Sequence, residues 1–118
     1  MKTLVIAEAG VNHNGDMDLA RRLVNAAADA GADMVKFQTF SADRLASASA
    51  KKAEYQSRTT GEQESQRDML RRLELSEPQH HALQEQCLTR GIGLHSTGFD
   101  IQTVDLLVGI RLPQFKIP

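Results

Sequence analysis

Two lysines, a glutamate, an amide and two hydroxyls stand at or near the ends of short apolar segments of this chain. They are Glu8, Lys36, Gln38, Ser96, Thr97 and Lys116. Ammonium and hydroxyl groups bind phosphate or carboxylate anions through charge-assisted hydrogen bonds. A glutamate beside them can act as an acid or a base. If the four segments lie side by side, these residues predict a site for a small anion, with Glu8 as the candidate for proton transfer.

The segment Met34–Thr39 is the most informative of the four. Alternation along a strand places Lys36 and Gln38 on the same face, opposite Val35 and Phe37. A lysine in a buried strand must be paired, neutralised or reserved for an anion. The alternative is an edge strand whose lysine faces water. The segment therefore predicts either an ion-paired or anion-binding lysine, or an ordinary surface one.

The elements that must position these side chains alternate regularly. The patterns predict strands at Thr3–Ala7, Asp33–Gln38, Ile92–Ser96 and Gln114–Ile117, and helices that begin after Asp16, Ser76 and Asp100. Such alternation predicts a parallel α/β sheet, either doubly wound or a (β/α)8 barrel, and both bind ligands at the carboxyl ends of the strands. A complete barrel needs about 250 residues, so about four parallel strands correspond to roughly half of one.

A polar insertion at about 41–63 interrupts this order and shows no sustained hydrophobic period. Loops longer than about 12–15 residues are usually functional lids or disordered segments. We expect a partly helical lid here, followed by a short helix that carries Met69, Leu70 and Leu73.

Composition narrows the function classes. The 118 residues are 41% hydrophobic and 25% charged with a net charge of -1, which is typical of a soluble globular domain and provides no basic field for nucleic acid or anionic lipid. The apolar start is shorter than a signal-peptide core, and no apolar run approaches ~18 residues. Cys87 is the only cysteine and is expected in the core. These features predict a cytoplasmic protein with neither a nucleic-acid nor a membrane partner.

The four histidines do not predict a metal site. His13, in a turn, is either a metal ligand or a residue that stabilises the turn. His80 and His81 are expected on the solvated side of a helix, and His95 is expected as a hydrogen-bonded core residue in a strand. No glycine-rich phosphate loop is present either.

Four segments carry a family resemblance. In order they are Ala7–Gly15, Gly31–Thr39, Ser96–Asp100 and Pro113–Pro118. Together they resemble the N-terminal part of the N-acetylneuraminate (sialic acid) synthase family, which includes related nonulosonic-acid synthases and spore-coat polysaccharide biosynthesis proteins. The resemblance covers essentially the whole chain and implies that it is the N-terminal half of a (β/α)8 TIM-type barrel. The remaining barrel and a C-terminal antifreeze-like domain are then absent from these 118 residues.

The resemblance also implies an activity, namely condensation of phosphoenolpyruvate with an N-acetylated hexosamine, with Mn2+ or Mg2+ as cofactor. By motif, Glu8 matches a catalytic carboxylate and Gln38 a sugar-binding position. Lys36, Thr97 and Lys116 match phosphoenolpyruvate-binding positions, and Ser96 adjoins them. The implied metal ligands lie outside this chain. The segment alone is therefore expected to be inactive, and its unclosed sheet is expected to associate into homo-oligomers.

One departure and two alternatives remain. Gly98 stands where the family usually has proline, which loosens the backbone after Thr97 and can alter phosphate placement. An aldolase-like barrel with another acceptor, or a non-catalytic anion-binding or structural fragment, would fit the same strand-end residues.

Overall fold

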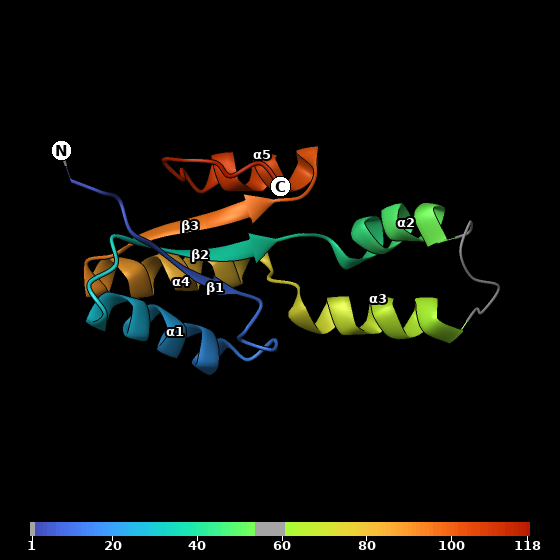
Figure 1. The fold of residues 1–118 in the computed structure, drawn as a ribbon, viewed down its shortest axis with the longest axis horizontal. Helices are drawn as coiled ribbons and strands as arrows, with labels where there is room; N and C mark the ends of the chain where they lie inside the picture. Colours follow the sequence, from blue (N-terminus) through green and yellow to red (C-terminus); the bar gives the residue numbers. More distant parts are fainter. Residues whose placement is uncertain (1, 54–60) are drawn as a thin grey trace.

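A computed structural model describes residues 2–53 and 61–118 of the chain (Figure 1). Its sheet has three parallel strands in the order β1 (Ile6–Gly10), β2 (Met34–Thr39) and β3 (Gly93–Gly98). The helices are α1 (Met17–Asp29), α2 (Ala42–Ala53), α3 (Gly61–Leu73), α4 (Glu77–Arg90) and α5 (Ile101–Gly109). The predicted α/β class is confirmed, and the alternating parallel order agrees with part of a (β/α)8 barrel.

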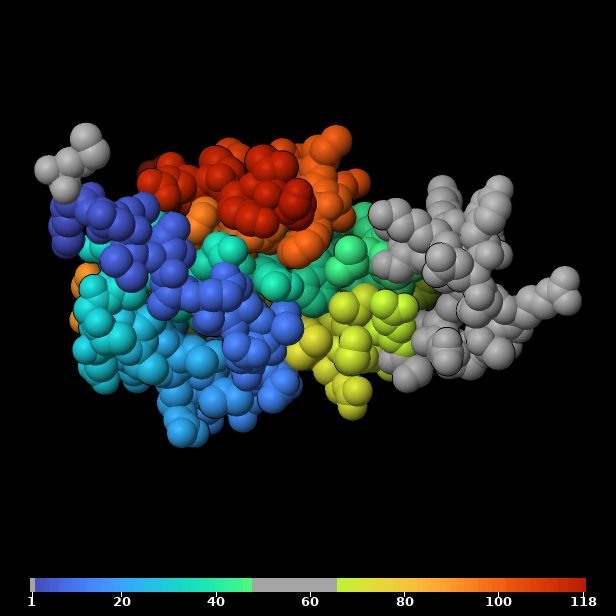
Figure 2. All heavy atoms as spheres, viewed as in Figure 1, coloured from blue at the N-terminus to red at the C-terminus, as the bar shows by residue number. Residues whose placement is uncertain are grey.

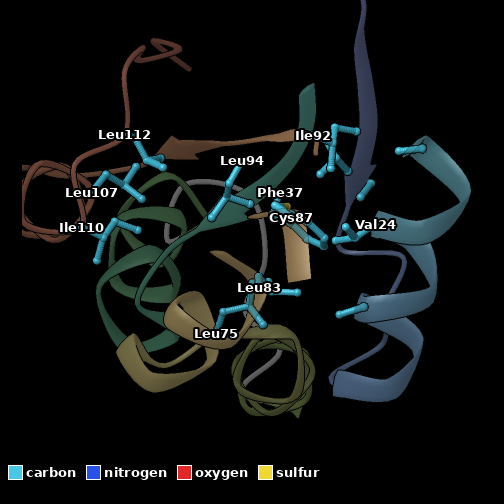
Figure 3. Packing of buried hydrophobic residues seen from close by; sticks show 14 residues of the cluster. Val24, Phe37, Leu75, Leu83, Cys87, Ile92, Leu94, Leu107, Ile110 and Leu112 are labelled. Atoms are coloured by element: carbon cyan, nitrogen blue, oxygen red, sulfur yellow. The ribbon is translucent and has the colours of Figure 1, made fainter. Parts of the chain in front are cut away.

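One face of the sheet carries the core. Val35, Phe37 and Leu94 belong to this core, and α1, α4 and α5 pack against the strands that carry them. Phe37 and Leu94 are seen among the buried side chains in Figure 3. They meet buried helical side chains that include Val24, Leu83, Cys87 and Leu107. Burial raises the pKa of the Cys87 thiol to about 11, which makes this cysteine an unreactive core residue, as predicted.

The opposite face, which we call the open face, has no helix over it among the described residues. The strand predicted at Thr3–Ala7 begins only at Ile6, and Leu4, Val5 and Ile6 are exposed. The apolar, β-branched residues of Thr3–Ala7 predict a buried strand, and this prediction is wrong, because β1 is the edge of the described sheet and only its helix-facing side is covered. In the space-filling view, the blue N-terminal and red C-terminal segments lie on either side of a teal-to-green strip that comes from β2 and the segment after it (Figure 2).

The fourth predicted strand is reduced to one contact. Lys116 forms an isolated parallel bridge with Thr97, and no continuous strand surrounds it in the described residues. Pro113 and Pro118 flank this segment, and proline has no N–H to donate to a ladder. The bridge nevertheless continues the sheet in the predicted direction, beyond β3.

The predicted helix starts are confirmed at their capping residues. Asp16 accepts hydrogen bonds from the N–H groups of Asp18 and Leu19 at the start of α1. Ser76 and Asp100 each form a capping box, at α4 and α5 respectively. Gly91 ends α4 in the left-handed conformation. None of the described helices is both long and apolar enough to cross a membrane.

The insertion predicted at about 41–63 is partly helical, as expected. It contains α2 and the start of α3, which lie side by side beyond the carboxyl end of β2, whereas 54–60 lie outside the described residues (Figure 1). Arg71 of α3 donates to Asp43 of α2 at 2.9 Å, and Arg44 donates to the α5 cap Asp100 at 2.6 Å. The first ion pair joins the two helices of the insertion, and the second joins α2 to the start of α5, which follows the carboxyl end of β3.

Candidate active site

The parallel register gathers most of the predicted site residues on the open face. Glu8 of β1 pairs with Lys36 of β2, and Lys36 pairs with His95 of β3. Register partners in neighbouring strands point to the same side of a sheet, so these three residues form one row. One step toward the carboxyl ends, a second row holds Gln38, Thr97 and Lys116, linked by the Gln38–Thr97 pair and the Thr97–Lys116 bridge.

Lys36 is ion-paired within the first row. Its Nζ lies 2.8 Å from Oε2 of Glu8, and the two side chains retain 19% and 50% of their exposure. The alternative of an edge-strand lysine facing water is therefore wrong, since β2 is the central strand of the described sheet and Lys36 is mostly covered. The carboxylate compensates part of the cost of removing this ammonium from water.

Gly10 makes room for the polar groups above this pair. A Cβ at Gly10 would lie 3.1 Å from Oε1 of Glu8 and 3.8 Å from Nε2 of Gln38. Its φ of 56° is also a conformation that L side chains rarely adopt. The free oxygen of Glu8 and the amide of Gln38 thus approach the same point, and a side chain at position 10 would occupy it.

The second row supplies a buried hydroxyl and an exposed cation. Thr97 is buried, and Lys116 is exposed and has no ion pair with any described residue. The two ammonium groups, the hydroxyl and the amide can together bind an anionic ligand. An anion that reaches Lys36 must compete with Glu8, and Glu8 would then be released to exchange a proton.

Ser96 is the one predicted site residue that the structure does not bring to this face. Its register partner is Phe37, and both point toward the helices. The Ser96 hydroxyl is buried and lies 2.6 Å from Oγ1 of Thr39. Because adjacent strand residues face opposite sides of the sheet, the Ser96 side chain cannot contact a ligand that binds Thr97.

His95 is the residue that sequence reasoning did not assign to the site. It is buried, and its Nδ1 has no hydrogen-bond partner among the described residues. Burial lowers the pKa of His95, and the nearby charge of Lys36 lowers it further, so the neutral imidazole is favoured. The available signal was its spacing, because it stands two residues before Thr97 on a strand.

The other histidines take structural positions. His13 accepts a hydrogen bond from the N–H of Gly15 through Nδ1 at 2.9 Å, which confirms its turn-stabilising role. The prediction that His80 is solvated is wrong, because it is fully buried and hydrogen-bonded to Thr39. His81, next to it on α4, is exposed as expected.

The described residues do not fit the divalent cation that the resemblance implies. No three histidine, cysteine, aspartate or glutamate side chains in 2–53 and 61–118 gather closely enough to hold a metal ion. Glu8, the carboxylate nearest the anion-binding groups, already contacts an ammonium. A cation at this site would therefore need ligands in addition to these residues.

Comparisons with known proteins agree with the fold and the sequence motifs. The chain is 51% identical, over its full length, to N,N'-diacetyllegionaminic acid synthase of Legionella pneumophila, and covers 33% of that protein. It is 34% identical over 96% of its length to human N-acetylneuraminate-9-phosphate synthase, of which it covers 31%. The crystal structure of a sialic acid synthetase from Leptospira borgpetersenii, solved with citrate, superimposes on 99% of the chain with a TM-score of 0.81 at 28% identity, over 36% of that protein.

The chain thus spans about a third of the length of the relatives it matches, and it corresponds to their N-terminal part. The model of the NeuB family matches residues 23–118, which include β2, β3 and the Lys116 bridge. From the family match, these similarities and the shared fold, the chain belongs to the NeuB family.

Proposed function

We propose that the full-length protein condenses phosphoenolpyruvate with an N-acetylated hexosamine to form a nonulosonic acid. The observation that carries this proposal is the pair of rows on the open face, where Lys36, Thr97 and Lys116 can bind a phosphorylated carboxylic acid beside Glu8 and Gln38. The family's synthases of sialic-acid-type sugars support the same reaction class. Since the chain spans only about a third of these relatives, the reaction is assigned to the whole protein.

The roles of the residues follow from their charges and positions. Lys36 and Lys116 bind the phosphate and carboxylate charges of phosphoenolpyruvate, and the Thr97 hydroxyl donates a hydrogen bond between them. The Gln38 amide binds the acceptor sugar. His95, in the row of Lys36, offers its unpaired Nδ1 to a polar group of a bound substrate.

Carbon–carbon bond formation joins C3 of the enolpyruvate to the aldehyde carbon of the open-chain sugar, and the aldehyde oxygen takes up a proton to become a hydroxyl group. Water then adds to the positively charged C2, and phosphate leaves with cleavage of its C–O bond. Once the bound anion replaces it at Lys36, Glu8 is placed to accept a proton from the attacking water. The Mn2+ or Mg2+ implied by the family would take its ligands from outside the described residues, which form no site for it.

The acceptor we favour carries two acetamido groups. The chain is 51% and 52% identical to the N,N'-diacetyllegionaminic acid synthases of Legionella pneumophila and Campylobacter jejuni, compared with 34% to the human N-acetylneuraminate-9-phosphate synthase. Phosphoenolpyruvate contains no nitrogen, so both acetamido groups of such a product must come from the sugar. A di-N-acetylated hexosamine is therefore the first acceptor to test.

The test uses the full-length protein with phosphoenolpyruvate, Mn2+ and either a di-N-acetylated or a mono-N-acetylated hexosamine. We expect phosphate release that depends on the acceptor, a product mass equal to the sum of sugar and pyruvate, and a preference for the di-N-acetylated sugar. Reactions without acceptor or with a non-acetylated hexosamine are the controls. Absence of phosphate release with every acceptor would leave anion binding without catalysis as the function.

We also propose that the protein is a homo-oligomer. The exposed side chains Leu4, Val5 and Ile6 form an apolar edge beside the site, and such edges are usually covered in a stable protein. Light scattering on the full-length protein measures the assembly state. A monomer at micromolar concentration would show that the rest of the same chain covers this edge.

A further inference from the structure

A chain of buried polar groups crosses the helix-facing side of the sheet, directly behind the candidate active site. It consists of Ser96 on β3, Thr39 on β2, and His80 and Ser76 at the start of α4. The three linked side chains are each only 1% exposed. Their distances are 2.6 Å from Ser96 Oγ to Thr39 Oγ1, 2.8 Å from Thr39 Oγ1 to His80 Nε2, and 2.7 Å from His80 Nδ1 to the Ser76 carbonyl oxygen.

The direction of each hydrogen bond follows from the chemistry at the Ser76 end. A carbonyl oxygen can only accept, so Nδ1 of His80 carries the proton. In the neutral imidazole Nε2 is then an acceptor, and the Thr39 hydroxyl must donate to it. The Thr39 oxygen in turn accepts from Ser96. Burial, the largest effect on the pKa of His80, lowers that pKa and favours this neutral form.

The residues next to this chain are the ones that face the ligand. Gln38 immediately precedes Thr39, and Thr97 immediately follows Ser96. Gln38 and Thr97 are register partners on the open face, whereas Thr39 and Ser96 point to the helices. A side chain on one face of a strand fixes the backbone from which its neighbour projects to the other face. Displacement of Thr39 or Ser96 would therefore move the second row of the site.

The Ser76 end of this hydrogen-bond chain is itself immobilised. The Ser76 carbonyl accepts from the backbone N–H of His80 at 3.0 Å as well as from its ring. Ser76 also caps α4 through its hydroxyl, which accepts from Gln79. These hydrogen bonds thus connect the carboxyl ends of β2 and β3 to the first turn of α4, on the helix-facing side of the sheet.

We propose that His80 is a positioning residue. Through Thr39 and Ser96, it holds Gln38 and Thr97 at the spacing that a sugar and a phosphorylated acid require. This role rests on the proposed function. The buried position of His80 argues against direct contact with substrate. Its ring acts instead as the one element that joins both strands to α4 through side-chain hydrogen bonds in the described residues.

The kinetic test compares Thr39→Val with Thr39→Ser in the full-length protein. Valine keeps the branched shape and removes the hydroxyl, whereas serine keeps the hydroxyl. We expect Thr39→Val to raise KM for both substrates about fivefold, the effect of a lost neutral hydrogen bond, and Thr39→Ser to stay near wild type. A purely structural role would lower kcat through loss of folded enzyme and leave both KM values unchanged, which would overturn the proposal.

A spectroscopic test does not depend on activity. Nitrogen-15 spectra of the full-length protein should show His80 protonated at Nδ1 and unprotonated at Nε2, the less common tautomer of a free imidazole. Loss of the signals in His80→Asn and their persistence in His81→Gln assign them. An Nε2-protonated ring would overturn the hydrogen-bond chain.

The two tests also separate this proposal from the proposed function. If the wild type releases no phosphate with any acceptor, the proposed function fails and the positioning role fails with it, whatever the tautomer. If the wild type is active and Thr39→Val keeps both KM values, only the positioning role is overturned.

Discussion

The ammonium of Lys36 lies 2.8 Å from the carboxylate of Glu8 across the first pair of strands, on the face that no described helix covers. In this arrangement the carboxylate occupies the position that an incoming anion needs. Binding therefore exchanges one negative partner for another, and the net gain is smaller than that of an unpaired lysine. The same exchange leaves Glu8 without its counter-ion at the moment the substrate arrives.

Replacement of Lys36 by alanine should weaken phosphoenolpyruvate use. A charge-assisted contact is worth about 1.5–3 kcal/mol, so we expect KM for phosphoenolpyruvate to rise about tenfold or more. Steady-state kinetics of the full-length enzyme measure this. Lys2→Ala is the matched control, because Lys2 is exposed and pairs with Asp33 at the other end of the sheet. Unchanged KM and turnover in Lys36→Ala would remove Lys36 from the site.

Glu8→Gln tests proton transfer separately from binding. The amide keeps the shape of the side chain and removes its charge, so turnover should fall while KM for phosphoenolpyruvate stays the same or decreases, because Lys36 loses its competing partner. The measurement is the dependence of turnover on pH for both forms. Equal turnover at every pH would exclude Glu8 as a base.

His95→Leu tests the residue that lies beside Lys36 in the first row and was not assigned to the site from the sequence. Leucine is close to histidine in size and cannot hydrogen bond, so the fold should be retained. We expect kcat/KM to fall about fivefold, the value of one neutral hydrogen bond to a bound substrate. The melting temperature of the variant serves as the control for folding. Wild-type kcat/KM would show that the unpaired Nδ1 of His95 has no substrate partner.

Stability should decrease when the pH falls below about 7. Burial lowers the pKa values of His13, His80 and His95 below the ordinary value of 6.5. The unfolded chain then binds protons in a range where the folded protein does not, so the free energy of unfolding drops as the pH falls through 6.5 toward the folded-state values. The contribution of these neutral histidines to the free energy of unfolding is fully present above pH 6.5.

Urea unfolding of the full-length protein at about pH 7.5 and pH 5.5 measures this effect. His80→Asn should show a smaller difference between the two conditions than wild type, since one buried imidazole is removed. His81→Gln, at the neighbouring exposed position, should keep the wild-type difference. An identical midpoint at both pH values in wild type would contradict the prediction.

Gly15→Ala should destabilise the protein more than Gly31→Ala. Both glycines have positive φ, 79° and 81°. A Cβ at Gly15 would lie 2.0 Å from the carbonyl oxygen of Arg72, whereas nothing lies within 4 Å of one at Gly31. The two variants share the backbone strain, and their difference isolates the clash between the β1–α1 turn and α3. We expect that difference to be about 1–3 kcal/mol in denaturant unfolding; equal losses would mean that α3 can move away freely.

The order and direction of the main elements were predictable because their signals are local. Asp16, Ser76 and Asp100 satisfy the first N–H groups of helices within a few residues of themselves. The first helix of the insertion, α2, was missed as a regular element because Ala42–Ala53 combines good helix formers with no long apolar stripe. The fourth strand was overestimated because a strand needs a partner along its whole length, and Lys116 has only one bridged position.

The placement of the candidate site residues on one face was predictable where alternation along one strand sufficed, as for Lys36 and Gln38. It was not predictable where two strands had to be aligned. Whether Ser96 or Thr97 faces the ligand depends on the register with β2, which a single sequence does not specify. The burial of His80 depends on the presence of Thr39 and Ser96 across from α4. Thr39 is 41 positions from His80, and Thr39 and Ser96 are 57 positions apart.

Successive residues of β3 face opposite sides of the sheet, and this has a consequence for mutations at neighbouring codons. Leu94 and Ser96 belong to the packed side, and His95 and Thr97 belong to the ligand side. Damage at the first pair would lower the amount of protein in the cell, and at Ser96 it would also weaken substrate binding, while damage at the second would leave abundant protein with poor activity. A survey that measures abundance and activity together should therefore see the two phenotypes alternate with every residue along this strand.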